Sequence, residues 1–172
     1  MATAVHTRIR VQPVTPALAD GVRALRLAPG QDDDIGDPAF NLAQAQRDPG
    51  CEAMAVLADD AVVGFYRLDA TPNAIAGHDF GAPTMGLRAF VIDAALQGRG
   101  YGTRALRVAC ADMRARHPQQ RLLVLAVACR NLAAIAAYRH VGFVATGELL
   151  PGGRAGPQQL MLRDLGAAAV GH

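Results

Sequence analysis

The segment LRAFVIDAALQGRGYGTRAL, residues 87–106, predicts a passage from a buried strand into a helix through a glycine-rich turn. Residues 87–92 are mostly apolar and include branched side chains, which is typical of a strand inside a sheet. From Tyr101 onward, Ala105, Ala109 and Met113 recur about every four residues, which predicts an amphipathic helix. The turn between strand and helix is the segment 97–102.

Glycines alternate with other residues in this turn, at Gly98, Gly100 and Gly102. Glycine adopts a positive φ without strain and lets a ligand approach the backbone closely, because it has no Cβ. The unpaired N–H groups in the first turn of a helix, together with the positive end of the helix dipole, favour a bound anion. Arg99 and Arg104 add positive charge. The segment therefore predicts a phosphate-binding loop.

Two other phosphate-binding motifs do not fit. A P-loop requires a lysine, and the chain contains none. The dinucleotide-binding fingerprint requires a third glycine where the chain has Thr103, and an acidic residue about 20 positions further on. Residues 117–120 read HPQQ there. A nucleotide-dependent oxidoreductase is therefore disfavoured.

Length and composition predict one globular domain over residues 1–172, with a core over about 8–164 and a flexible tail over 165–172. A net charge of +2 does not favour nucleic acid as a partner. The three cysteines match no metal-ligand spacing, so we expect no metal. Cys110 and Cys129 lie in apolar patterns typical of reduced core residues, so we expect a cytoplasmic location. No signal peptide or long apolar run is present, so we expect no membrane partner.

Hydrophobic patterns predict strands over residues 8–14, 52–58, 61–70, 87–92, 121–128, 143–149 and 158–163. They predict helices over 16–27, 38–47, 101–116 and 132–139. Short turns join some strands into antiparallel hairpins, whereas helices join others as parallel crossovers. The order β-α-α-β-β-β-α-β-α-β-β therefore predicts an α/β fold, with a mixed sheet of about seven strands and about four helices.

Two segments resemble the GNAT family of acetyltransferases. Residues 97–102, QGRGYG, are similar to the Gln/Arg-x-x-Gly-x-Gly/Ala pyrophosphate loop of that family. Residues 131–143, NLAAIAAYRHVGF, are similar to its Asn-x-x-Ala-x-x-Leu-Tyr-x-x-x-Gly-Phe segment. The resemblance spans about residues 9–163, and the predicted order of elements is that of the family, so the GNAT fold is expected.

The resemblance implies that acetyl-CoA is the co-substrate. Backbone groups of Val91 and Ile92 would pair with the pantetheine arm. Asn131 and Ala134 would contact the arm, and Tyr138 would lie near the sulfur atom. The pyrophosphate would be bound by the loop residues Gln97, Gly98, Arg99, Gly100, Tyr101, Gly102 and Thr103.

The implied reaction is direct transfer of an acetyl group to a primary amine in a ternary complex. Tyr138 would give a proton to the leaving thiolate, and the Ile92 N–H would stabilise charge on the carbonyl oxygen. An amine with a pKa near ~10 must first lose a proton. Asp93 could orient the water that accepts this proton, or it could simply form a turn. Other candidates for the base are His78, Asp79, Glu148 and a chain of waters.

Asp32, Asp33 and Asp34 lie between the first two predicted helices, in a loop that borders the acceptor site in this family. An acidic loop attracts cations, which favours a polyamine-like acceptor, and residues 146–148 also resemble the diamine and polyamine branch. A solvated surface loop is the alternative. Arg154 stands where that branch commonly has a glutamate, which counts against a polyamine.

We therefore expect an N-acetyltransferase that acts on a small-molecule amine. The alternatives are a sensor that binds acyl-CoA without turnover and an acetyltransferase for protein or peptide amines. The resemblance also implies a homodimer, because members of the family often form one.

Overall fold

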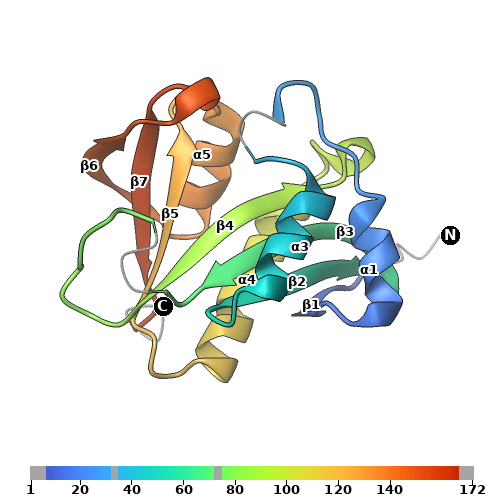
Figure 1. The fold of residues 1–172 in the computed structure, drawn as a ribbon. Coiled ribbons are helices and arrows are strands. Elements are labelled where there is room, and N and C mark those ends of the chain that lie inside the picture. Colours follow the sequence, from blue (N-terminus) through green and yellow to red (C-terminus); the bar gives the residue numbers. More distant parts are fainter. Residues whose placement is uncertain (1–6, 32–34, 72–74, 167–172) are drawn as a thin grey trace, which may run out of the picture.

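The structure, a computed structural model, describes residues 7–31, 35–71 and 75–166. Its centre is a seven-stranded mixed sheet in the order β1-β2-β3-β4-β5-β7-β6 (Figure 1). The strands are β1 Ile9–Pro13, β2 Cys51–Ala58, β3 Ala61–Asp69, β4 Thr84–Ile92, β5 Leu122–Ala128, β6 Val144–Leu150 and β7 Gln158–Asp164. The α-helices in the described ranges are α1 Pro16–Arg23, α3 Pro38–Arg47, α4 Tyr101–Arg116 and α5 Leu132–His140. The predicted order of strands and helices is confirmed.

The helices begin where the sequence supplies capping residues. Pro16 and Pro38 occupy the first turns of α1 and α3, where the missing N–H of proline leaves no hydrogen bond unmade. The Asp37 carboxylate accepts the Ala39 N–H at 3.3 Å, and the Asn131 side chain accepts the Ala134 N–H at 3.2 Å. Two short 3-10 helices, Ala94–Leu96 and Gly153–Ala155, are additional to the predicted elements.

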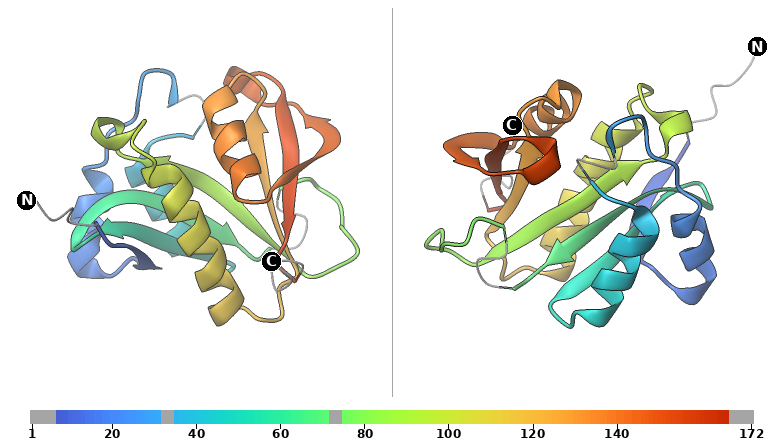
Figure 2. Two further views of the ribbon diagram at one scale, coloured as in Figure 1. Left: turned by 180° about the vertical axis from the view of Figure 1, so that it is seen from behind. Right: turned by 45° about the horizontal axis from the view of Figure 1, so that its top comes forward.

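The helices cover the two faces of the sheet. α1 and α3 lie on one face, and α4 and α5 lie on the other (Figure 2). Val22, Leu42 and Phe65 form part of the core beneath α1 and α3, whereas Leu106 and Met113 belong to the larger core beneath α4. β4 is therefore packed on both faces.

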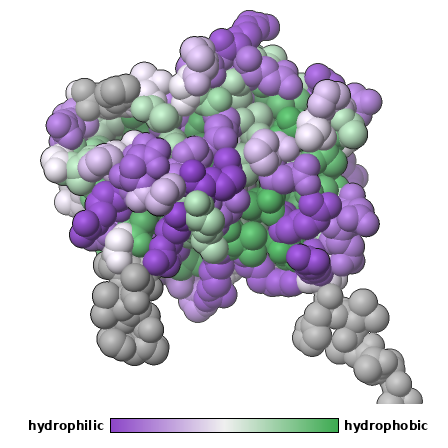
Figure 3. Space-filling view, turned by 90° about the horizontal axis from the view of Figure 1, so that it is seen from below, coloured by the Kyte–Doolittle hydropathy of each residue, from purple (hydrophilic) through white to green (hydrophobic). Residues whose placement is uncertain are grey.

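Polar side chains cover most of the face shown in Figure 3, with apolar patches between them. Among the described residues, no helix is both long and apolar enough to span a bilayer. At the C-terminal end Leu165 is buried, and its N–H donates to the Arg121 carbonyl at 2.8 Å. Leu165 and Gly166 were expected to belong to a flexible tail, but Leu165 is buried and the Gly166 N–H donates to the Asp164 carboxylate at 2.9 Å.

β4 and β5 separate soon after they meet. They are paired in parallel at only three positions, Thr84 with Leu122, Met85 with Leu123 and Gly86 with Val124. Beyond these pairs the two strands diverge (Figure 1). The space between residues 87–92 and 125–128 is called the wedge below.

A β-bulge in β4 lies beside the wedge. Phe65 faces Val91 and Arg67 faces Arg88, so Tyr66 is opposed by the two residues Ala89 and Phe90. Ala89 has a φ of 55°, in the left-handed region that alanine rarely adopts. A bulge adds one residue to a strand and bends it, which re-aims the groups that follow.

Candidate active site

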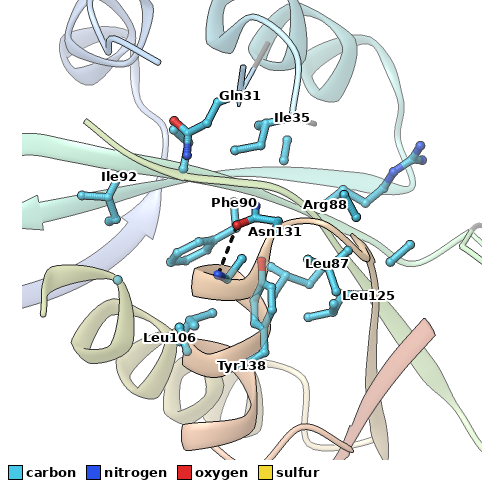
Figure 4. Close-up of a pocket in the computed structure, with 18 of the residues that line it drawn as sticks. Gln31, Ile35, Leu87, Arg88, Phe90, Ile92, Leu106, Leu125, Asn131 and Tyr138 are labelled. Carbon is cyan, nitrogen blue, oxygen red and sulfur yellow. Dashed lines mark hydrogen bonds between the residues drawn. The ribbon is translucent and has the colours of Figure 1, made fainter. Parts of the chain in front are cut away.

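A cavity of about 480 Å³ fills the wedge and continues to the α3 side of β4. It is lined by main-chain and side-chain atoms of β4, β5 and α5, and by part of the glycine-rich loop. Figure 4 shows Tyr138 on one side of β4, with Gln31, Ile35 and Arg88 on the other. The cavity therefore has two ends: a coenzyme end, formed by residues 97–102 and 131–138, and an acceptor end, formed by Gln31, Ile35, Asn41, Arg67 and Arg88.

The peptide of Ile92 faces the wedge. The Asp93 N–H donates to the Val63 carbonyl at 2.8 Å, so Gly64 and Ile92 form a non-hydrogen-bonded pair of the antiparallel ladder. The N–H and C=O of such a residue point away from the paired strand. Val91 alternates with Ile92, and its peptide is directed toward Phe65 of β3. Of the two, Ile92 therefore presents its N–H to the cavity.

Gln97 connects the glycine-rich loop both to β4 and to the acceptor end of the cavity. Its amide group donates to the Ile92 carbonyl at 2.9 Å and to the Gln31 side-chain oxygen at 2.9 Å. The same oxygen of Gln31 accepts the Ala28 N–H at 2.8 Å. The side chain of Gln97 thus satisfies the Ile92 carbonyl and leaves the Ile92 N–H for a ligand.

The loop of residues 97–103, called the cradle below, has the predicted backbone. Gly98 and Gly100 have φ values of 78° and 81°, and open space surrounds the position that a Cβ would occupy at each. Gly100 is the N-cap of α4, and the first helical hydrogen bond, from the Arg104 N–H to the Gly100 carbonyl, is 3.2 Å long. The first turn of α4 contains no acidic residue, so its N–H groups offer a positive site for an anion.

The other cradle residues have different surroundings. Gln97, Gly98 and Gly102 line the cavity, whereas Arg99, Gly100, Tyr101 and Thr103 lie on the same turn outside the lining. The Arg104 guanidinium donates to the Thr7 carbonyl and lies 5.9 Å from the centre of the Tyr101 ring. Arg99 is exposed.

Helix α5 presents small residues to the cavity, with one tyrosine among them. Asn131, Ala134, Ala137 and Tyr138 all line the wedge. The Asn131 oxygen is used as the helix cap, which leaves its amide N–H groups for a ligand. The two alanines leave room between α5 and the strands for a narrow chain.

Tyr138 places its hydroxyl in the cavity, as Figure 4 shows. Its ring packs edge-on against Phe143, with ring centres 5.5 Å apart. Burial raises the pKa of Tyr138, because the surroundings disfavour a phenolate. Tyr138 is therefore a neutral phenol near neutral pH, which is the form that donates a proton.

Asp93 has a structural environment. Its carboxylate accepts the Arg26 N–H at 2.7 Å and the Ala95 N–H at 3.2 Å, and the Arg26 guanidinium lies 3.4 Å away. Burial works to raise the pKa of Asp93, but these hydrogen bonds outweigh it and hold the pKa below its ordinary value. Asp93 is not among the cavity residues, so it ties the segment after α1 to the end of β4.

The remaining candidates lie elsewhere. Asp32, Asp33 and Asp34 are outside the described residues. His78 lies 2.7 Å from Glu148 and lines a separate cavity of about 350 Å³, together with Asp79. A hydrogen bond from the His78 ring to the Asp79 carbonyl, together with the Glu148 carboxylate, raises the pKa of this exposed histidine. His78, Asp79 and Glu148 are therefore not among the residues that line the wedge.

Sequence reasoning missed the arginines of the acceptor end. Arg67 and Arg88 face each other across β3 and β4, and both line the cavity. Arg67 is only 8% exposed and donates to the Asn41 side chain at 3.1 Å. Arg88 pairs with the buried Asp69 at 3.1 Å. The available signal in the sequence was a basic residue within an apolar strand. The face of the sheet on which such a residue lies depends on strand register, which the sequence does not give.

Comparison with known proteins agrees with this geometry. A model of the acetyltransferase (GNAT) family matches residues 20–143. The chain belongs to the GNAT acetyltransferase family. It is accordingly an acetyl-CoA-dependent N-acetyltransferase, and acetyl-CoA is its co-substrate. A search of curated protein sequences gave no match.

Several solved structures share this GNAT fold. The aminoglycoside acetyltransferase AAC(6')-Ib with coenzyme A has a TM-score of 0.72 at 16% identity, over 95% of this chain and 99% of that one. The same enzyme with ribostamycin and coenzyme A has a TM-score of 0.75 at 17% identity, over 95% and 97%. Spermidine N-acetyltransferase from Vibrio cholerae with CoA and spermine has a TM-score of 0.69 at 16% identity, over 92% and 96%. Identities this low show a shared fold.

The residues of this GNAT fit the coenzyme. The cradle offers N–H groups and open space for a pyrophosphate, and the wedge offers a main-chain donor at Ile92. The small face of α5 leaves room for an extended arm, which would end beside Tyr138.

Proposed function

We propose that the protein transfers the acetyl group of acetyl-CoA to a primary amine of a small molecule, by direct attack in a ternary complex. The observation that supports this is the single cavity that joins the cradle, the Ile92 N–H and the Tyr138 hydroxyl, and then continues past β4 to the acceptor end. Two substrates that enter from opposite ends would meet between Ile92 and Tyr138.

Each group along the coenzyme end has a proposed task. The N–H groups of the cradle, from Gln97 to Thr103, bind the pyrophosphate. The Asn131 amide binds the pantetheine arm, Ala134 packs against it, and the Ile92 N–H binds the thioester at the end of the arm. Val91 was predicted to pair with the arm as Ile92 does, but its peptide is directed toward Phe65 of β3, so we assign it no hydrogen bond to the arm.

The bound coenzyme supplies an activated thioester. The Ile92 N–H donates to the carbonyl oxygen as the amine nitrogen attacks the carbonyl carbon and negative charge develops. Tyr138 gives its proton to the sulfur as the carbon–sulfur bond breaks, and the proton released by the nitrogen returns through water to Tyr138. The products are an N-acetylated amine and free CoA thiol.

We assign removal of the first proton from the amine to water rather than to a carboxylate. Asp93 has a lowered pKa and is hydrogen-bonded to Arg26, so it is a weak base that faces away from the cavity. The rate should therefore rise with pH as the fraction of neutral amine increases.

The test is release of free CoA thiol from acetyl-CoA in the presence of a panel of amines. The panel contains spermidine, putrescine, amino acids, an aminoglycoside and short peptides. Release that depends on a small-molecule amine supports the proposal, whereas release with peptides alone favours a protein acetyltransferase. Tight binding of acetyl-CoA without release by any amine would instead favour the acyl-CoA sensor.

Three further proposals concern the acceptor and the setting. The charge of the Asp32–Asp34 loop favours a polyamine-like acceptor, which is one candidate class and is tested by the spermidine and putrescine of the panel. The three free cysteines support a reducing compartment, and we propose the cytoplasm, where acetyl-CoA is available. We propose a homodimer because members of the family often form one, and light scattering of the purified protein tests this proposal.

A further inference from the structure

The acceptor end of the cavity has a positive charge. Among the cavity-lining residues that the structure describes, the charged ones are Arg67 and Arg88, and both are cations. They are a directly opposed pair on β3 and β4, so both side chains lie on the same face of the sheet. That is the face covered by α3, whose Asn41 bonds to Arg67.

Arg67 is a buried cation with neutral partners. One guanidinium nitrogen donates to the Asn41 oxygen at 3.1 Å, and another lies 3.8 Å from the Cys51 sulfur. Burial raises the pKa of Cys51, so this thiol is not an anion near neutral pH. The Nε atom of Arg67 is enclosed and has no hydrogen-bond partner, and no carboxylate of a described residue lies within ion-pair distance of Arg67.

A buried charge ordinarily has a counter-charge, because desolvation is costly. An arginine cannot avoid that cost by losing its proton. Arg88 has its counter-charge in Asp69, a carboxylate that is 4% exposed and also accepts the Thr71 N–H at 2.9 Å. The group of Arg67, Arg88 and Asp69 therefore has an excess of one positive charge, which matches one carboxylate of a ligand.

On the basis of the proposed function, we infer that the acceptor is an amine that also carries a carboxylate, and that Arg67 and Arg88 bind this carboxylate. The planar fork of a guanidinium matches the two oxygens of a carboxylate. With the carboxylate on the α3 side of β4, the amine of a small amino acid is directed toward the Ile92 N–H and the Tyr138 hydroxyl. The substrate class is thus an amino acid or a closely related zwitterion.

A purely structural role for Arg67 makes a different prediction. Asn41 also donates to the Ile35 and Asp37 carbonyls, at 3.1 and 3.2 Å, so Arg67 could act only by holding Asn41 and the chain before α3 in place. Loss of a structural support would lower kcat/KM equally for every acceptor. Loss of a carboxylate-binding group would lower kcat/KM only for acceptors that carry a carboxylate.

The experiment compares acceptors that differ only in the carboxylate. CoA release at saturating acetyl-CoA is measured for each common α-amino acid and for its α-carboxamide, with kcat/KM expressed per unprotonated amine because amidation lowers the pKa of the amine. For the accepted side chains we expect the acid to exceed the amide by about 10- to 100-fold. Equal kcat/KM values for acid and amide across the panel would overturn the inference.

Variants assign the preference to the arginines. In Arg67→Gln the kcat/KM of the acid should fall to that of the amide. The kcat/KM of the amide should stay within about 3-fold of its wild-type value. Arg67→Lys should retain part of the preference for the acid. Arg88 is exposed, so Arg88→Gln tests the same site should Arg67→Gln fail to fold. Arg121→Gln is the matched control, since Arg121 pairs with Asp164 at 3.1 Å outside the cavity. An equal fall for acid and amide would overturn the assignment.

Failure of the inference differs from failure of the proposed function. Transfer to spermidine or to carboxamides without any preference for acids would leave the acetyltransferase intact and remove the carboxylate site. Absence of CoA release with every amine, despite binding of acetyl-CoA, would overturn both.

Discussion

The two ends of the cavity are built from different parts of the chain. The coenzyme end consists of two continuous segments, the cradle and the first turns of α5, and it presents mostly main-chain groups, glycines and alanines. The acceptor end brings together Gln31, Asn41, Arg67 and Arg88 from four separate elements or loops, and it presents charged and polar side chains. The first end depends on backbone conformation, and the second depends on side-chain identity.

This difference matches the tasks that we propose for the two ends. A coenzyme used by a whole family can be bound by main-chain N–H groups, which any sequence with suitable glycines provides. An acceptor is distinguished by a few side-chain charges, which substitution changes readily. The fold and the coenzyme can thus stay constant while the acceptor changes.

The largest effect is expected at the point where the two ends meet. In Tyr138→Phe, kcat should fall by about 100-fold or more, because the thiolate would leave without its proton donor. The dissociation constant for acetyl-CoA should remain within about 3-fold of wild type, since the ring and its contact with Phe143 are kept. Single-turnover kinetics and calorimetry measure the two quantities. An unchanged kcat would remove Tyr138 as the acid.

The next effect tests the coenzyme end alone. Gly100→Val places a branched side chain at a φ of 81° and fills the open side of the cradle, so the affinity for acetyl-CoA should fall by about 30-fold. Gly81→Val is the control, because Gly81 has a similar φ of 76° and lies outside the cavity. Equal losses of affinity in both variants would show that strain, rather than the cradle, is responsible.

Charge in the loop before α3 separates two acceptor classes. Replacing Asp32, Asp33 and Asp34 by asparagine should change the kcat/KM for an amino acid by less than about 3-fold if Arg67 and Arg88 select the acceptor. A polyamine acceptor predicts instead a rise of about 10-fold in the KM for spermidine. Steady-state kinetics with both acceptors therefore decide between the acidic loop and the two arginines.

The smallest effect concerns stability. Asp93→Asn should lower the free energy of unfolding by about 1 kcal/mol, because the charged acceptor for the Arg26 and Ala95 N–H groups is lost. The pKa of Asp93 is lowered in the folded state, so its stabilisation is present above the unfolded pKa of about 4 and disappears as the pH falls below it. Denaturant unfolding at pH 7 and at pH 3 measures this difference. Turnover slowed by about 10-fold or more in this variant would instead restore Asp93 to the catalytic machinery.

The coenzyme end could be predicted from the sequence because its signals are local. Glycines at fixed spacing imply a backbone conformation wherever the chain lies, and Asn131 to Tyr138 repeat at helical spacing within one short segment. For the same reason α3 and α5 were predicted to within one residue of their observed ends.

The acceptor end could not be predicted because it depends on register. Arg67 and Arg88 are far apart in the sequence, and they face each other only because the bulge at Ala89 and Phe90 shifts the pairing of β3 and β4 by one residue. A shift of one residue moves a side chain to the opposite face of the sheet. The opening between β4 and β5 was also not predicted, since the uniformly apolar residues 121–128 indicate burial but not where pairing stops.

The short pairing of β4 with β5 has a mechanical consequence. Only three residue pairs join the half of the sheet formed by β1 to β4 to the half formed by β5, β7 and β6. An extended ligand in the opening would lie where further pairs of β4 with β5 would otherwise form, and it would add contacts between the two halves. These contacts between the halves of the sheet would then form when the ligand binds and be lost when the product leaves, once in each turnover.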